Sequence, residues 1–82
     1  MNYSAVLLVA QPGRLEQALT DAAAIPGVDI HQIDRSRERA ICTLEAASID
    51  DEVRLFSVVR SLEAVLDLSL IEHLPEADVP AA

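Results

Sequence analysis

The strongest constraint on the fold is the order in which strand-like and helix-like spacings of apolar residues follow one another. A strand is expected over residues 3–11, because its centre, Val6 to Val9, is apolar throughout. A helix is expected next, because apolar residues then recur at the three- and four-residue spacing of one buried helix face. These are Leu15, Ala18, Leu19 and Ala22.

Proline and glycine mark both ends of this first helix. Pro12 and Gly13 end the first strand, and we expect the proline in the first helical turn, where its missing N–H costs nothing. The segment 25–27, Ile-Pro-Gly, ends the helix, because proline cannot continue it and glycine adopts a left-handed or turn conformation.

The second half of the chain repeats the pattern after a hairpin. Residues 28–34 alternate as a half-buried strand does, 35–38 have the length of a turn but no glycine, and 39–46 form the return strand. Ser48 and Asp51 are spaced as in a capping box, with Ser48 as the N-cap and Asp51 reaching back. A last strand is expected over residues 65–74, after a second helix with four buried positions. These are Leu55, Val58, Val59 and Leu62.

The resulting order, βαββαβ, predicts an α+β fold of two βαβ halves with right-handed crossovers. We expect a ferredoxin-like split βαβ sandwich, in which a four-stranded antiparallel sheet carries both helices on one face. Residues 1–74 are predicted to form a single domain, and residues 75–82 a short, flexible, acidic tail.

The charge balance restricts the partners of such a domain. Fourteen Asp and Glu residues face six Arg and no Lys, giving a formal net charge of −8. This field repels phosphate backbones and anionic lipid, and only Tyr3 and Phe56 are aromatic, so we expect no nucleic-acid partner. The apolar run from Ala5 to Ala10 is too short for a membrane span and has no preceding Arg or Lys, so we expect no membrane insertion and a cytoplasmic location.

The reactive residue types are too few for an obvious catalytic or metal site. Cys42 is the only cysteine, which excludes an internal disulfide and a site with several thiolates. His31 and His73 are the only histidines, and the fold places their strands on opposite edges of the sheet, without a third ligand nearby. The chain has no CxxC loop, no glycine-rich phosphate loop and no catalytic pattern of carboxylates. We therefore expect no enzyme activity, no catalytic residues, no metal and no cofactor.

The sheet face without helices is the expected functional surface. Strand alternation predicts helix-facing positions at Val28, Ile30, Ala40, Cys42, Leu44, Leu66, Leu68 and Leu70. The opposite, open face then carries Asp29, His31, Arg39, Ile41, Thr43, Glu45, Asp67, Ser69, Ile71 and His73. The orientation of the first strand stays undetermined, because either alternate set of residues 6–9 places large aliphatic side chains on the open face.

An aliphatic stripe with an acidic edge suits a peptide that carries both apolar and basic residues. A homodimer formed sheet to sheet would bury the same stripe and is an equal alternative on the pattern alone. The candidate peptide-binding residues are Asp29, His31, Ile41, Thr43, Glu45, Asp67, Ser69, Ile71, Glu72 and His73.

Three segments resemble the NapD-type chaperones of periplasmic nitrate reductase. They are the corner at residues 25–30, the end of the return strand at 44–46 and the closing strand at 65–73, which runs into a histidine. The likeness covers roughly residues 5–73. Two turns depart from the family pattern, because Ser36 to Glu38 and Ala64 stand where the family tends to have glycine.

This resemblance implies a cytoplasmic chaperone that binds the twin-arginine signal peptide of the nitrate reductase catalytic subunit and delays its export until the cofactor is inserted. Asp29, Glu45, Asp67 and Glu72 would then meet the arginines, with Ile41, Ile71 and the first strand holding the apolar segment. The main alternative is an amino-acid-sensing module of ACT type, for which Gly13 in the loop after the first strand is weakly suitable. A third is a module that only oligomerises, as in a weak homodimer through the sheet.

Overall fold

The computed structural model describes residues 1–74 and confirms the predicted order of elements. The predicted acidic tail, residues 75–82, lies outside the described residues. The strands are β1 (Asn2–Ala10), β2 (Val28–Asp34), β3 (Arg39–Ala46) and β4 (Val65–Leu74), and the helices are α1 (Leu15–Ala23) and α2 (Ile49–Arg60).

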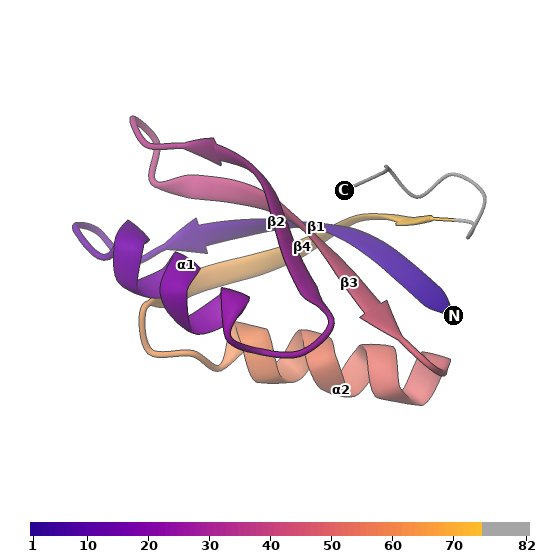
Figure 1. Cartoon of the computed structure of the whole chain (residues 1–82). Helices are drawn as coiled ribbons and strands as arrows, with labels where there is room; N and C mark the ends of the chain where they lie inside the picture. The colour runs from indigo at the N-terminus through magenta and orange to yellow at the C-terminus, as the bar shows by residue number, and fades with distance from the viewer. Residues whose placement is uncertain (75–82) are drawn as a thin grey trace.

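The four strands form one antiparallel sheet in the order β2-β3-β1-β4. The first strand is therefore central, pairing with β3 on one side and with the last strand, β4, on the other. Both helices cover the same face of this twisted sheet, as Figure 1 shows. The ferredoxin-like prediction is confirmed, and no helix of residues 1–74 covers the other face.

The core lies between the helices and alternate residues of the two central strands. Val6, Leu8 and Leu44 are 0% exposed, and they pack with the small apolar residues of α1. All four residues predicted for the buried face of α1 belong to this core. Residues of the wrong size here would leave cavities or strain, because such interiors are close-packed.

Three irregularities in strand pairing change which face certain residues occupy. The register shifts between Ile30 and Gln32 in β2 and at two points between β1 and β4, next to Leu66 and Ile71. An extra residue on one strand interrupts the alternation of faces, so simple counting fails beyond it. Leu66, predicted to face the helices, is 56% exposed, and that prediction is wrong.

The helix ends differ from the predictions in two details. α1 begins at Leu15 with Arg14 as its N-cap, so Pro12 lies in the preceding turn rather than in the helix; Gly13, with φ of 77°, separates the two. Ser48 is the N-cap of α2, as predicted, and its hydroxyl accepts the amide N–H of Asp51 at 3.1 Å. The Asp51 carboxylate contacts Arg54 at 3.3 Å instead of capping the chain at Ser48.

The buried face of α2 is rotated from the one predicted. Val59 is buried and Leu55 and Leu62 pack on the core, but Val58 is 48% exposed, and its predicted burial is wrong. Glu52 and Phe56 complete the inner face: Phe56 follows Glu52 by four residues and precedes Val59 by three, the spacing of one helix face.

Gly27, at the corner between α1 and β2, is required by the backbone. Its φ is 93°, and a Cβ at this position would lie 2.5 Å from the carbonyl oxygen of Glu45. The close approach also makes a hydrogen bond, because the amide of Glu45 donates to the carbonyl of Gly27 at 2.8 Å. Gly13 has a similar φ of 77° but no atom within 4 Å of the corresponding Cβ position.

The substitution Gly27→Ala should lower the free energy of unfolding by about 2–4 kcal/mol, because it adds a steric clash to backbone strain. Gly13→Ala is the matched control and should lose only about 1–2 kcal/mol, the cost of the left-handed conformation. Urea denaturation followed by circular dichroism measures both. Equal losses in the two variants would contradict the role given to the close approach.

Cys42 faces the core from the middle of β3 and is 1% exposed. Burial raises the pKa of its thiol from 9.0 to about 11, because the thiolate cannot be solvated there. The folded protein therefore keeps the thiol proton at pH values at which the unfolded chain loses it.

The thiol contribution to stability should be constant below pH 9 and fall as the pH rises towards 11. At pH 10 the free energy of unfolding should be lower than at pH 7 by roughly 1.4 kcal/mol more than in a Cys42→Ala variant. The reason is that pH 10 lies one unit above the pKa of the unfolded thiol, and one pKa unit corresponds to that free energy. Urea denaturation of both proteins at pH 7 and pH 10 measures this difference. In addition, the native thiol should react with a disulfide reagent only as fast as the protein unfolds, and faster labelling would contradict the burial argument.

Within residues 1–74, neither helix is both long and apolar enough to cross a membrane.

Candidate functional site

The structure determines the orientation of β1, which the sequence left open. Ser4, Val6, Leu8 and Ala10 are buried on the helix side, so their neighbours occupy the open face. These neighbours are Tyr3, Ala5, Leu7 and Val9, all partly exposed. The central strand thus places two large aliphatic side chains, Leu7 and Val9, in the middle of the open face.

Two adjacent hollows on the open face share Gln32 and Ile41, and each has a volume of about 380 Å³. The first is lined by Leu7, Gln32, Ile33, Asp34, Arg39, Ala40, Ile41 and Ile71. The second is lined by Ala5, His31, Gln32, Ile41, Thr43, Glu72 and Leu74. Together they make a depression that crosses the sheet from β2 to β4, and we call it the open-face groove.

The groove brings together half of the residues predicted for the site. His31, Ile41, Thr43, Ile71 and Glu72 line it. Sequence alternation would have turned Glu72 towards the helices, but the irregularity beside Ile71 aligns Glu72 with Ala5 of the open face. Thr43 is only 5% exposed, because its neighbours on both sides cover it.

The four predicted carboxylates differ in how far they are already engaged. Glu45 accepts a hydrogen bond from the hydroxyl of Tyr3 at 3.3 Å. Asp67 lies 3.9 Å from a guanidinium nitrogen of Arg60 and accepts the hydroxyl of Ser69 at 3.1 Å. Within residues 1–74, no hydrogen bond or ion pair engages the side chains of Asp29 and Glu72.

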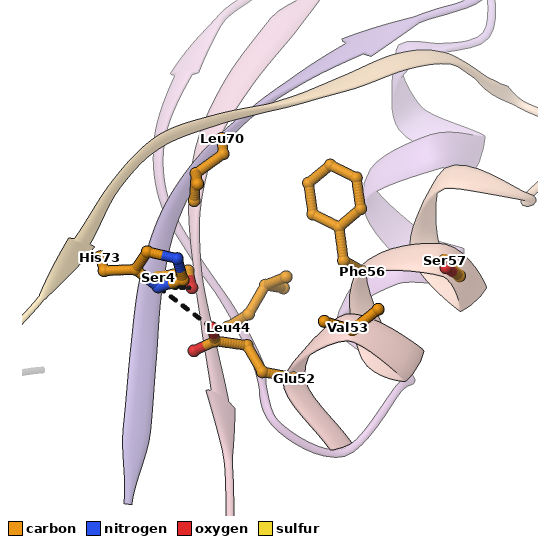
Figure 2. Close-up of a pocket in the computed structure, with 8 residues that line it drawn as sticks. All are labelled: Ser4, Leu44, Glu52, Val53, Phe56, Ser57, Leu70 and His73. Atoms are coloured by element: carbon orange, nitrogen blue, oxygen red, sulfur yellow. Dashed lines mark hydrogen bonds and ion pairs between the residues drawn. The ribbon is translucent and has the colours of Figure 1, made fainter. Parts of the chain in front are cut away.

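His73 does not lie on the open face, so that part of the prediction is wrong. It pairs with Ser4, a helix-side residue of β1, and its Nδ1 lies 3.1 Å from Oε1 of Glu52 on α2. Figure 2 shows the ring directed at that carboxylate. The physical cause is the irregularity beside Ile71, beyond which the alternation of faces in β4 is shifted by one residue.

The separation of His31 and His73 also removes the metal site that the two histidines could have shared. They belong to the two edge strands, β2 and β4, and one faces the open side while the other faces α2. No cluster of three or more metal-ligating side chains occurs among residues 1–74.

Arg39 is the basic residue that sequence alternation placed on the open face. Its Nε lies 3.6 Å from the carboxylate of Asp34, and both line the groove. The pKa of Asp34 is lowered, first by a hydrogen bond from the hydroxyl of Ser36, with a smaller contribution from Arg39. At neutral pH this pair offers a peptide no unbalanced positive charge.

Seven residues that line the groove were not among those predicted for the open face or the binding site. Ile33, Asp34 and Ala40 stand at the β2–β3 end of the groove, and Ala40 was predicted to face the helices. The other four are Ala5, Leu7, Gln32 and Leu74. Leu7 and Ala5 were missed because the apolar run in β1 has no alternation, Gln32 because of the irregularity in β2, and Leu74 because it follows the one in β4. No local pattern marks an irregularity of this kind without knowledge of the partner strand. The assembled groove, with aliphatic walls and the unengaged carboxylate of Glu72, can bind an extended or helical segment that is apolar and cationic.

Comparison with known proteins agrees with this architecture. The family model described as "NapD protein" matches residues 1–77. The solution structure of the E. coli Tat proofreading chaperone protein NapD is similar, with a TM-score of 0.80 and 24% sequence identity over 98% of this chain and 87% of that chain. A search of curated proteins finds no match. The match over residues 1–77 shows that the chain belongs to the NapD family.

Proposed function

We propose that this chain is a cytoplasmic chaperone whose open-face groove binds the twin-arginine signal peptide of the periplasmic nitrate reductase catalytic subunit. Binding would delay export until the cofactor is inserted and maturation is complete. The observation that carries the proposal is an aliphatic groove with the unengaged carboxylate of Glu72 in a chain of the NapD family. The similar E. coli protein, a Tat proofreading chaperone, supports the same role.

The chemistry of a twin-arginine signal peptide complements the groove. Such a peptide has a basic start and an apolar middle, and the groove offers Leu7, Ile41 and Ile71 to the apolar part. Of the four predicted carboxylates, Glu72 in the groove and Asp29 on β2 have no hydrogen bond or ion pair among residues 1–74, so they can accept guanidinium groups without breaking another ion pair. The net charge of −8 adds long-range attraction for the basic end.

The expected strength of these contacts is sufficient for a specific complex. A hydrogen bond to a charged group contributes about 1.5–3 kcal/mol, and two of them with apolar burial reach the roughly 8 kcal/mol of a micromolar complex. Arginine is favoured over lysine, because its planar guanidinium can bind a carboxylate through two parallel hydrogen bonds.

The two alternatives remain as outcomes of the same test. An ACT-type sensor would need the loop after β1, but the Gly13 amide there already donates to the Glu38 carboxylate at 2.7 Å, which weakens that alternative. A sheet-to-sheet homodimer would occupy the open-face groove itself. It would appear as a dimer in sedimentation experiments, and signal peptide would dissociate it.

Calorimetric titration of the protein with a synthetic twin-arginine signal peptide from a nitrate reductase of the same organism should give saturable binding. A peptide with Lys-Lys in place of the two arginines should bind at least tenfold more weakly, since it lacks bidentate hydrogen bonding. No measurable binding of the twin-arginine peptide would overturn the proposal. Titration with free amino acids would then test the sensor alternative.

The variant Glu72→Gln should weaken binding of the signal peptide by about 10- to 100-fold, the equivalent of about 1.5–3 kcal/mol. Asp67→Asn should have a smaller effect, because Arg60 and Ser69 already engage Asp67. Glu63→Gln is the control. Glu63 lies in the turn between α2 and β4, its side chain is 89% exposed, and it pairs with Arg14. An equal effect of all three substitutions would show only a general charge effect.

The apolar contribution is tested at Ile41, which lines both hollows. Ile41→Ser should weaken binding by about tenfold or more, because the apolar segment loses its central contact. Val58→Ser, on the exposed side of α2, is the matched control and should leave the dissociation constant unchanged. Thermal denaturation must show that both variants are folded at the titration temperature; unchanged affinity of a folded Ile41→Ser protein would exclude the groove as the binding site.

A further inference from the structure

A third hollow lies on the opposite side of the sheet from the open-face groove, between α2 and the end of β4. Its volume is about 310 Å³, and it is lined by Ser4, Leu44, Glu52, Val53, Phe56, Ser57, Leu70 and His73. Figure 2 shows Phe56, Val53 and Glu52 directed from α2 towards side chains of the sheet. We call this hollow the α2 pocket.

The α2 pocket contains a buried carboxylate that is only half engaged. Glu52 is 4% exposed, and its Oε1 lies 3.1 Å from Nδ1 of His73. Its Oε2 is buried, and no described residue gives it a hydrogen bond. Among residues 1–74, then, the carboxylate contacts His73 through one oxygen, and no group donates a hydrogen bond to the other.

The arginines of this chain do not supply that donor. Arg54, on the turn of α2 next to Glu52, contacts Asp51, and Arg60 contacts Asp67. Arg14, Arg35 and Arg39 pair with carboxylates elsewhere on the surface, and Arg37 lies in the turn between β2 and β3. A buried carboxylate oxygen without a hydrogen bond is unfavourable, so a cationic donor from outside the chain would be bound strongly here.

The residues that line the pocket indicate what else a ligand must contain besides a positive charge. Leu44, Phe56 and Leu70 make most of the lining apolar, and the phenyl ring of Phe56 can lie against a cation. Of the lining residues, Val53 is 61% exposed and Leu70 48%, and Ile49, one turn before Val53 on α2, is 67% exposed. An aliphatic rim around a carboxylate fits a cationic side chain flanked by apolar residues in a polypeptide.

We propose that the α2 pocket binds an arginine side chain of a partner protein, with apolar neighbours of that arginine packing on Val53 and Leu70. The guanidinium pairs with both oxygens of Glu52 and displaces His73. The imidazole can move away because it stands at the end of an edge strand with 67% of its side chain exposed. The site is separate from the open-face groove, so the chain can hold two partners on opposite faces.

The probe is the pentapeptide acetyl-Ala-Leu-Arg-Leu-Ala-amide, followed by two-dimensional NMR of the ¹⁵N-labelled protein. We expect saturable changes in the backbone amide chemical shifts of residues around the α2 pocket, with smaller changes on the open face. The residues affected should be Ser4, residues 52–57, Leu70 and His73. The same peptide with citrulline, which has the shape of arginine without its charge, should bind at least tenfold more weakly. Shifts confined to the open-face groove, or none, would overturn the proposal.

Two variants locate the site, and a third separates it from the proposed chaperone function. Glu52→Gln should weaken binding of the pentapeptide at least tenfold, and so should Val53→Trp, which fills the mouth from an exposed position in case the first variant does not fold. Glu72→Gln, in the open-face groove, should leave pentapeptide affinity unchanged. Unchanged affinity in a folded Glu52→Gln or Val53→Trp protein would overturn the assignment, whatever the signal-peptide titration shows.

Discussion

The structure depends on β1, a central strand that is apolar on both faces. One set of its side chains, including Val6 and Leu8, is fully buried under the helices, and the alternate set, with Leu7 and Val9, lies on the open face. A central strand of a two-layer sandwich needs only one apolar face for its core. The second apolar face therefore requires another explanation, and binding of an apolar segment supplies one.

The irregularities in the edge strands determine how charge is distributed around this apolar centre. The shift beside Ile71 keeps Glu72 on the open face and turns His73 towards Glu52 on α2. Because of one extra residue in β4, the carboxylate of Glu72 lies unengaged on the open face, whereas His73 contacts one oxygen of Glu52 on the helix side. The two binding sites proposed here are consequences of the same local departure from regular pairing.

The sequence was sufficient for the fold because each element has its own local pattern. The bounds of β2, β3 and β4 were predicted as observed, and Ser48 as the cap of α2. The candidate site was predicted only in part, since the faces of Leu66, Glu72 and His73 depend on pairing with β1, a contact between the two ends of the chain. Burial of Glu52 was missed because carboxylates are rarely buried and its neighbours in sequence are exposed.

The strand order has a consequence for how the protein is made. Of the four strands in residues 1–74, β1 is synthesised before the others, yet one of its two partners, β4, is made after them. Until β4 leaves the ribosome, β1 is an edge strand with unpaired backbone groups, and Leu8 lacks its register partner Leu68. The sheet is therefore completed only once β4 has been translated, so its closure depends on pairing between distant parts of the domain, which slows folding.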